Sequence, residues 1–181
     1  MKLKMALFAG CLFALATCTF AADHAGDKSD LSATATESYQ IRNKKFGDLL
    51  RPKDANNAEG TRIVLYPAEP WKCMTWKLRP AGESTFHVQN HFTSKTFTVN
   101  ASHGETNVIQ TAFAREAGER PVWRFTKLAD GSYQITDVKS GAALTAVGGD
   151  GQPVRVVVAP WQDQDAQKWE LEKTDPAKLT M

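Results

Sequence analysis

Apolar and polar residues alternate over short stretches along most of this chain. Residues 167–171 read QKWEL, so the apolar Trp169 and Leu171 are separated by the charged Glu170. Successive side chains of a β-strand point to opposite faces of the sheet, so this alternation predicts a strand with Trp169 buried and its charged neighbours in water. Three further segments of this kind precede it, separated by turn-rich sequence: 132–138, 142–147 and 153–160.

The same series of segments occurs three times. The phrases TWKL, VWRF and KWEL place Trp76, Trp123 and Trp169 at separations of 47 and 46 residues. The predicted strands of the first two units are 38–43, 48–52, 61–67, 75–78, 85–90, 95–100, 107–114 and 122–125. Twelve short strands without an amphipathic helix predict an all-β fold closed into a barrel. Three equal units would place the three tryptophans at equivalent positions in one core.

The first 21 residues predict a secretory signal peptide. Two lysines precede the apolar stretch MALFAGCLFALA, and small residues follow at Thr19 and Ala21. The apolar stretch is short for a membrane span, so we expect no transmembrane segment in the mature chain. The motif LATC, which ends at Cys18, resembles a bacterial lipobox, and a lipid anchor on Cys18 is the alternative to ordinary cleavage. Either way the protein is expected to be exported, as a periplasmic or secreted protein.

The remaining chain divides into a tail, a barrel and a short end. Residues 22–37 are polar and predict a flexible tail, and residues 176–181 are assigned to a C-terminal tail. Residues 38–175 form the predicted barrel, with repeats at about 38–80, 84–127 and 132–173.

Charge and cysteine content argue against several classes of function. The chain has 22 Lys and Arg against 20 Asp and Glu, but two of the lysines lie in the leader, so the mature chain is formally neutral. Without a basic run, nucleic-acid binding is not expected. Ordinary cleavage leaves Cys73 alone, and we interpret it as a buried apolar residue. The sequence has no motif for a catalytic triad, a metal or another cofactor, which disfavours an enzyme.

The third unit resembles a ricin-type (R-type) lectin repeat. It contains SYQITDVKSGAAL, GGDGQPVRVVVAPW and QKW, and Gln-x-Trp near the end of each unit is the hallmark of that family. The resemblance covers about residues 39–172 and implies a β-trefoil of three repeats with four short strands each. It also implies a non-catalytic protein that binds a carbohydrate or glycoconjugate. In such a protein Gln167 and the tryptophans Trp76, Trp123 and Trp169 are structural.

The sugar-binding positions of the family are changed in every repeat. Members that bind galactose-like sugars carry an Asp just after the second-strand leucine, an aromatic residue at the end of the third strand and an Asn just before the Gln-x-Trp glutamine. The three repeats have Arg51, Thr98 and Thr145 at the Asp position, Tyr66, Phe113 and Ala159 at the aromatic position, and Cys73, Arg120 and Ala166 at the Asn position. The glutamine itself is Met74 and Pro121 in the first two repeats. A sugar would therefore have to be held in another way.

Two clusters of loop residues are candidate carbohydrate-binding sites. The third repeat offers Asp150, Trp161, Gln162 and Asp163, and the first offers Asp54, Asn56, Tyr66 and Trp71. An aromatic face suits the apolar side of a sugar ring, and carboxylates and amides suit its hydroxyls. Alternatively, the Asp and Asn residues form turns and the tryptophans pack against the barrel. We prefer the third repeat, because it retains Gln167 and because a proline precedes Trp161.

The altered sugar positions also support a second hypothesis. A trefoil without the usual acceptors can serve as a protein-interaction module, such as a toxin targeting subunit, an inhibitor or an envelope scaffold. The fold by itself does not distinguish this role from carbohydrate binding.

Overall fold

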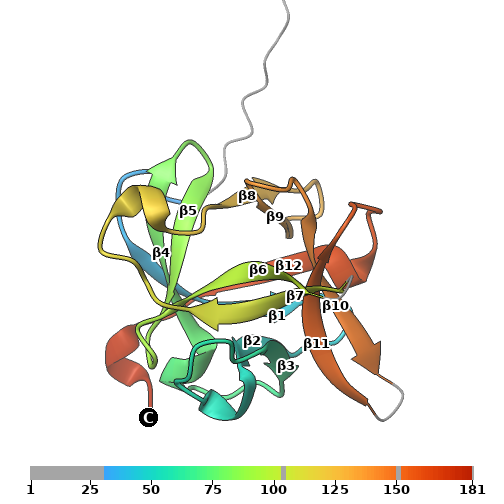
Figure 1. Cartoon of the computed structure of the whole chain (residues 1–181), viewed down its shortest axis with the longest axis horizontal. Coiled ribbons are helices and arrows are strands. Elements are labelled where there is room, and N and C mark those ends of the chain that lie inside the picture. The colour runs from blue at the N-terminus through green and yellow to red at the C-terminus, as the bar shows by residue number, and fades with distance from the viewer. Residues whose placement is uncertain (1–30, 103–104, 150–151, 181) are drawn as a thin grey trace, which may run out of the picture.

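Twelve β-strands build the computed structural model, which describes residues 31–102, 105–149 and 152–180 (Figure 1). They are β1 (Glu37–Asn43), β2 (Leu49–Pro52), β3 (Ile63–Tyr66), β4 (Thr75–Gly82), β5 (Thr85–Asn90), β6 (Thr96–Ser102), β7 (Glu105–Thr111), β8 (Trp123–Lys127), β9 (Tyr133–Asp137), β10 (Ala143–Gly149), β11 (Gln152–Ala159) and β12 (Lys168–Lys173). Five short 3-10 turns complete the described elements: η1 (Lys53–Ala55), η2 (Lys72–Met74), η3 (Ala117–Glu119), η4 (Asp165–Gln167) and η5 (Pro176–Lys178). The predicted all-β class is confirmed.

Six of the strands close into an antiparallel barrel. β1 pairs with β4, β4 with β5, β5 with β8, β8 with β9, β9 with β12, and β12 returns to β1. Each repeat contributes its first and fourth strands to this ring. Closure leaves no free edge in the barrel, which removes the unpaired backbone groups of an open sheet.

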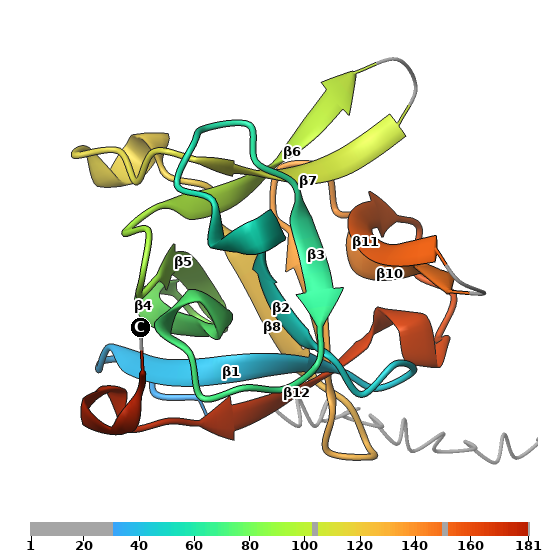
Figure 2. The same ribbon diagram turned by 90° about the horizontal axis from the view of Figure 1, so that it is seen from below.

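The other six strands form three hairpins that cover one end of the barrel. β2 pairs with β3, β6 with β7, and β10 with β11. The hairpins are joined in a triangle by three contacts, Val64 with Arg155, Asn107 with Val157, and Arg62 with Ile109. Figure 2 shows β3 next to the β6–β7 and β10–β11 hairpins. A six-stranded barrel with a triangle of hairpins is the β-trefoil that the sequence predicts.

The three repeated tryptophans lie at equivalent places in the core. Trp76, Trp123 and Trp169 are 1%, 0% and 0% exposed. Each indole N–H donates to a backbone carbonyl in the second strand of its own repeat: Leu50 (2.9 Å), Phe97 (3.3 Å) and Leu144 (3.0 Å). Each tryptophan therefore ties a barrel strand to a hairpin strand, and the buried N–H does not lose its hydrogen bond.

The two ends of the described chain lie against the trefoil. Leu31 belongs to the segment predicted as a tail, yet it is buried in the main apolar cluster. In the segment assigned to the C-terminal tail, η5 leads to Thr180, which bridges to Trp71 and whose amide donates to the Pro70 carbonyl at 2.9 Å. Thr180 is therefore held against the first repeat, whereas residues 176–178 are exposed. The predicted signal peptide and Cys18 lie outside the described residues.

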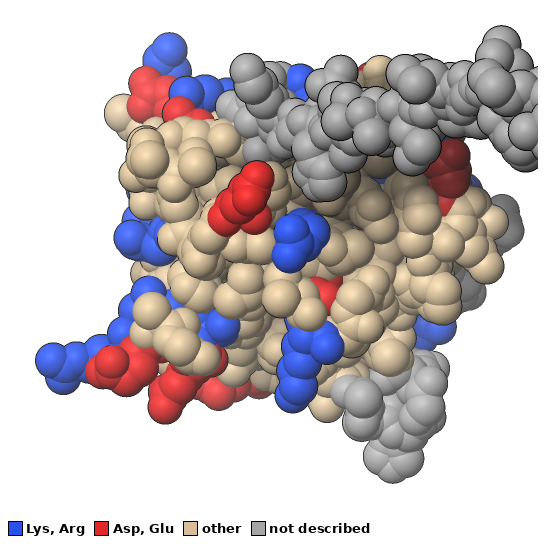
Figure 3. Space-filling model, turned by 90° about the horizontal axis from the view of Figure 1, so that it is seen from above, with Lys and Arg blue, Asp and Glu red and all other residues tan. Residues whose placement is uncertain are grey.

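The surface carries charges of both signs. Lys and Arg side chains are interspersed with Asp and Glu on the face shown in Figure 3. In the described part of the chain, no helix is long and apolar enough to cross a membrane.

Candidate functional site

A buried glutamine fixes the loop between β11 and β12 in the third repeat. The Gln167 carboxamide oxygen accepts a hydrogen bond from the Gln162 amide at 2.7 Å. Its nitrogen donates to the Pro160 carbonyl at 2.8 Å and to the Thr145 hydroxyl at 3.1 Å. These bonds hold the backbone on both sides of Trp161. The loop conformation is therefore set by the fold before any ligand arrives.

Trp161 lines an open hollow of about 400 Å³ beside the β8–β9 turn. Asp130, Asp163 and Lys168 line it with Trp161, and Leu128 and Ala129 complete the wall. Trp161 is partly buried but belongs to neither of the two apolar clusters found among the described residues. Its ring is therefore not one of the large side chains that build the core.

Charged groups in this hollow hold one another in place. The Asp163 carboxylate lies 3.0 Å from the Lys168 ammonium. Asp130 pairs with Lys44 at 2.7 Å, and this hydrogen bond, with those from Ser132, keeps the pKa of Asp130 well below its ordinary value. Asp130 is thus an ionised acceptor at neutral pH.

The structure brings together part of the predicted third-repeat cluster. Trp161 and Asp163 line one hollow, and the exposed Gln162 lies between them in the chain. Asp150, the fourth residue of that prediction, lies outside the described residues. Asp130 and Lys168 were not predicted, because their proximity depends on how the β8–β9 turn packs beside the third-repeat loop.

An arginine covers the aromatic pair of the first repeat. The Arg51 guanidinium lies 3.8 Å from the centre of the Tyr66 ring and 6.0 Å from that of Trp71, and the two ring centres are 6.0 Å apart. Asp54 joins the group, with a carboxylate oxygen 4.0 Å from Arg51. Trp71 packs on a small buried cluster that contains Cys73. Trp71 is therefore partly buried.

Two other first-repeat residues have structural surroundings. The Asn56 side chain accepts a hydrogen bond from the Ala58 amide at 2.8 Å, which is the turn-forming alternative. Cys73 is buried, and burial raises the pKa of its thiol while the nearby Arg51 charge opposes this rise. A thiol in this environment is a packing residue.

The second repeat shows the same covering of its aromatic residue. The Arg120 guanidinium lies 4.4 Å from the centre of the Phe113 ring, and that of Arg79 lies 5.7 Å away. The Arg120 Nε donates to the Ala114 carbonyl at 2.7 Å, which holds the guanidinium there. A planar cation stacked on a ring occupies the face that a sugar would use. The usual sugar platform is therefore covered in two repeats and replaced by Ala159 in the third.

The third repeat matches the model of a known protein family. Residues 121–181 match the family model described as ricin-type beta-trefoil lectin domain-like. The predicted ricin-type resemblance is confirmed. The matched segment includes Gln167 and Trp169, the pair that completes Gln-x-Trp. No curated protein matches the chain in a sequence comparison.

Solved structures share the fold of the whole described domain. A designed three-fold symmetric protein, ThreeFoil, is 24% identical with a TM-score of 0.68, and the match covers 76% of this chain and 99% of that one. An exo-beta-1,3-galactanase from Clostridium thermocellum is 21% identical with a TM-score of 0.65, over 77% of this chain but 31% of its own. The earthworm R-type lectin C-half, solved in complex with GalNAc, is 15% identical with a TM-score of 0.56, over 76% and 99%. At these identities the likeness establishes the β-trefoil fold.

Proposed function

We propose that this protein is an exported, non-catalytic β-trefoil that binds carbohydrate at the hollow lined by Trp161. The observation that carries the proposal is a tryptophan outside the core, on a loop clamped by Gln167, beside the side-chain oxygens of Asp130 and Asp163. The lectin-like family that residues 121–181 match supports it. So does the earthworm R-type lectin of the same fold, which was solved with GalNAc.

The chemistry of the hollow suits a sugar ring. The apolar face of a pyranose stacks on an indole, and its hydroxyls donate to carboxylate oxygens and accept from an ammonium group. Trp161, Asp163 and Lys168 supply these three groups within one hollow. Because the hollow is open and shallow, we expect weak binding by one site, strengthened when several sites act together.

The proposal is tested by titrating the exported chain with a broad panel of glycans and polysaccharides. Binding is followed by tryptophan fluorescence at millimolar ligand. Trp161→Ala should weaken binding by at least about tenfold, or about 1.4 kcal/mol, and leave the melting midpoint nearly unchanged. Phe92→Ala is the matched control, because Phe92 is an aromatic residue that is 47% exposed on the second repeat.

The outcomes of this titration are distinct. A chain that binds no glycan overturns the proposal. Normal binding by the Trp161→Ala variant removes the ligand from this hollow and makes Tyr66 with Trp71 the next site to test. Unfolding of the variant would assign Trp161 to packing.

A second function, a protein-interaction module, is favoured by one specific observation. Arg51 and Arg120 cover the aromatic residues that would otherwise stack on sugars. Pull-down from envelope or host extracts, repeated with free sugars as competitors, separates the two functions. Partners that sugars displace favour carbohydrate binding, and partners that persist favour the interaction module.

A further inference from the structure

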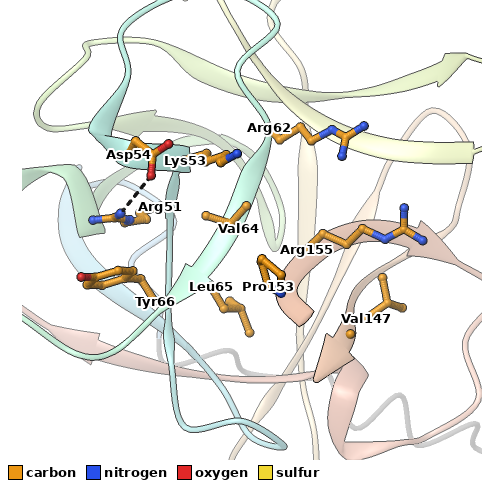
Figure 4. Close-up of a pocket in the computed structure, with 11 residues that line it drawn as sticks. Arg51, Lys53, Asp54, Arg62, Val64, Leu65, Tyr66, Val147, Pro153 and Arg155 are labelled. Carbon is orange, nitrogen blue, oxygen red and sulfur yellow. Dashed lines mark ion pairs between the residues drawn. The ribbon is translucent and has the colours of Figure 1, made fainter. Parts of the chain in front are cut away.

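A second and larger pocket lies between the β2–β3 and β10–β11 hairpins. It has a volume of about 660 Å³, within the range of about 300–1,000 Å³ that is usual for small-molecule sites. Val64, Val147 and Pro153 supply its apolar wall (Figure 4). The hollow lined by Trp161 shares none of its lining residues.

Strand register explains why basic side chains gather in this pocket. Arg51 on β2 is opposite Val64 on β3, and Val64 is opposite Arg155 on β11. Directly opposed side chains share a face of the sheet, so the two arginines lie on one face about 10 Å apart, across two inter-strand spacings. Arg62 precedes Val64 by two positions and shares that face.

Lys53 completes the basic group. Its backbone amide donates to the Arg62 carbonyl at 2.9 Å, which brings the two residues side by side. Figure 4 shows the Lys53 side chain directed toward Arg62, and the Arg62 and Arg155 side chains extending in the same direction. The pocket is thus lined by four cationic side chains: Arg51 from β2, Arg155 from β11, Lys53 from η1, and Arg62 from the position just before β3.

The positive charge of Lys53 and Arg62 is weakly compensated by described residues. Among the described residues, Asp54 is the one acid that lines the pocket, and its side chain is 76% exposed and 4.0 Å from Arg51. Neither Lys53 nor Arg62 forms an ion pair with a described residue. An anion that enters the pocket is attracted by several cations at once, and it also reduces the repulsion between them.

Arg51 gives the pocket a preorganised donor. Its side chain is 8% exposed and fixed over Tyr66, so little conformational entropy remains to be lost when a ligand binds. Its Nε is buried without a hydrogen-bond partner in the described part of the chain. In sugar-binding relatives this position is the acceptor Asp, so the donor and acceptor roles are reversed here.

We propose that this pocket binds the anionic group, a carboxylate or a sulfate, of an acidic saccharide. The ligand class rests on the proposed carbohydrate-binding function, whereas the anionic group follows from the pocket itself. Guanidinium groups bind such planar or tetrahedral oxyanions through paired N–H donors. The apolar wall and the volume leave room for the sugar ring that carries the anion.

Calorimetric titration of the exported chain with four probes tests this assignment. The probes are tetragalacturonate, a sulfated heparin tetrasaccharide, neutral maltotetraose and inorganic sulfate. At low salt at least one acidic tetrasaccharide should bind, and the double variant Lys53→Gln/Arg62→Gln should weaken it by about tenfold or more. Raising ionic strength to about 0.15 M, where the Debye length is about 8 Å, should weaken binding by the wild-type chain.

The matched control is Arg115→Gln/Arg124→Gln, which removes the same charge from exposed positions outside the pocket. It should change the affinity by less than about twofold. Equal weakening by both double variants, or no binding of either acidic tetrasaccharide, overturns the proposal. Binding of sulfate without either tetrasaccharide overturns the saccharide class. Trp161→Ala separates the two sites. A neutral glycan that no longer binds to Trp161→Ala but still binds to Lys53→Gln/Arg62→Gln is bound in the hollow lined by Trp161. The two proposals can therefore fail independently.

Discussion

Replacing Trp169 by alanine should lower the free energy of unfolding by about 3–5 kcal/mol. The side chain is fully enclosed, so its removal leaves a cavity that the closed barrel around it resists filling. The substitution also removes the indole donor to the Leu144 carbonyl, 3.0 Å away, and an unpaired buried carbonyl costs about 1–3 kcal/mol. The two effects overlap, so the range for large aromatic residues already includes the lost hydrogen bond.

Urea denaturation followed by far-UV circular dichroism measures this loss without depending on the tryptophan that is removed. Trp169→Phe keeps an aromatic ring but removes the N–H and part of the indole, so it should lower the free energy of unfolding by less than Trp169→Ala does. Trp76→Ala is the control for symmetry, because Trp76 donates to Leu50 in the same way at 2.9 Å, and it should fall in the same range as Trp169→Ala. A loss below about 1 kcal/mol for Trp169→Ala would refute both the core assignment and the equivalence of the repeats.

Two further predictions concern the loop clamp and acid stability. Gln167→Met should lower the free energy of unfolding by about 1–3 kcal/mol and weaken glycan binding at Trp161, because it removes the hydrogen bonds that hold the loop. Thermal melts measure the first effect and glycan titration the second. Unchanged values of both would contradict the role of Gln167 in holding the loop. Burial, with the positive charges of Lys77, Lys72 and Arg79, lowers the pKa of His91 from its ordinary value of 6.5 to about 4. Between pH 6.5 and 4, His91 therefore binds a proton more readily in the unfolded chain than in the folded one. The free energy of unfolding should keep its full value above pH 6.5 and fall as the pH drops toward 4. After allowance for solvent screening, the expected loss is about 1–2 kcal/mol. Urea titrations at pH 7 and pH 5 should show a smaller difference for His91→Gln, and an equal difference would contradict the assignment.

The fold could be predicted because its determinants repeat in the sequence. Strand alternation reports which face is buried, and the spacing of Trp76, Trp123 and Trp169 reports the three-fold arrangement. These patterns are local or periodic, so they can be recognised from the sequence alone. The indole-to-carbonyl bonds follow from the same equivalence, since each tryptophan meets the second strand of its own repeat.

The surroundings of the candidate sites could not be predicted in the same way. The stacking of Arg51 on Tyr66 depends on the register of β2 and β3 and on one side-chain rotamer. The docking of Thr180 beside Trp71 joins two segments far apart in sequence that have no periodic pattern. The basic pocket could not be predicted from the sequence either, because its cations come from separate repeats: Arg51, Lys53 and Arg62 from the first and Arg155 from the third. Alternation along β3 could have placed Arg62 with Tyr66 on one face, but not Arg155 next to them.

The three repeats separate what stabilises the fold from what can bind a ligand. All three retain the buried tryptophan and its bond to a hairpin carbonyl, because losing either would open the shared core. The loop and strand-end positions are not constrained in this way, and they differ among the repeats. Arg51 and Arg120 each place a cation on the aromatic residue of their repeat, whereas the third repeat keeps Gln167 and displays Trp161 on the clamped loop. The core therefore permits one trefoil to present an indole with acceptors in one hollow and a set of cations in another, and the two proposed binding specificities rest on these local groups rather than on the fold.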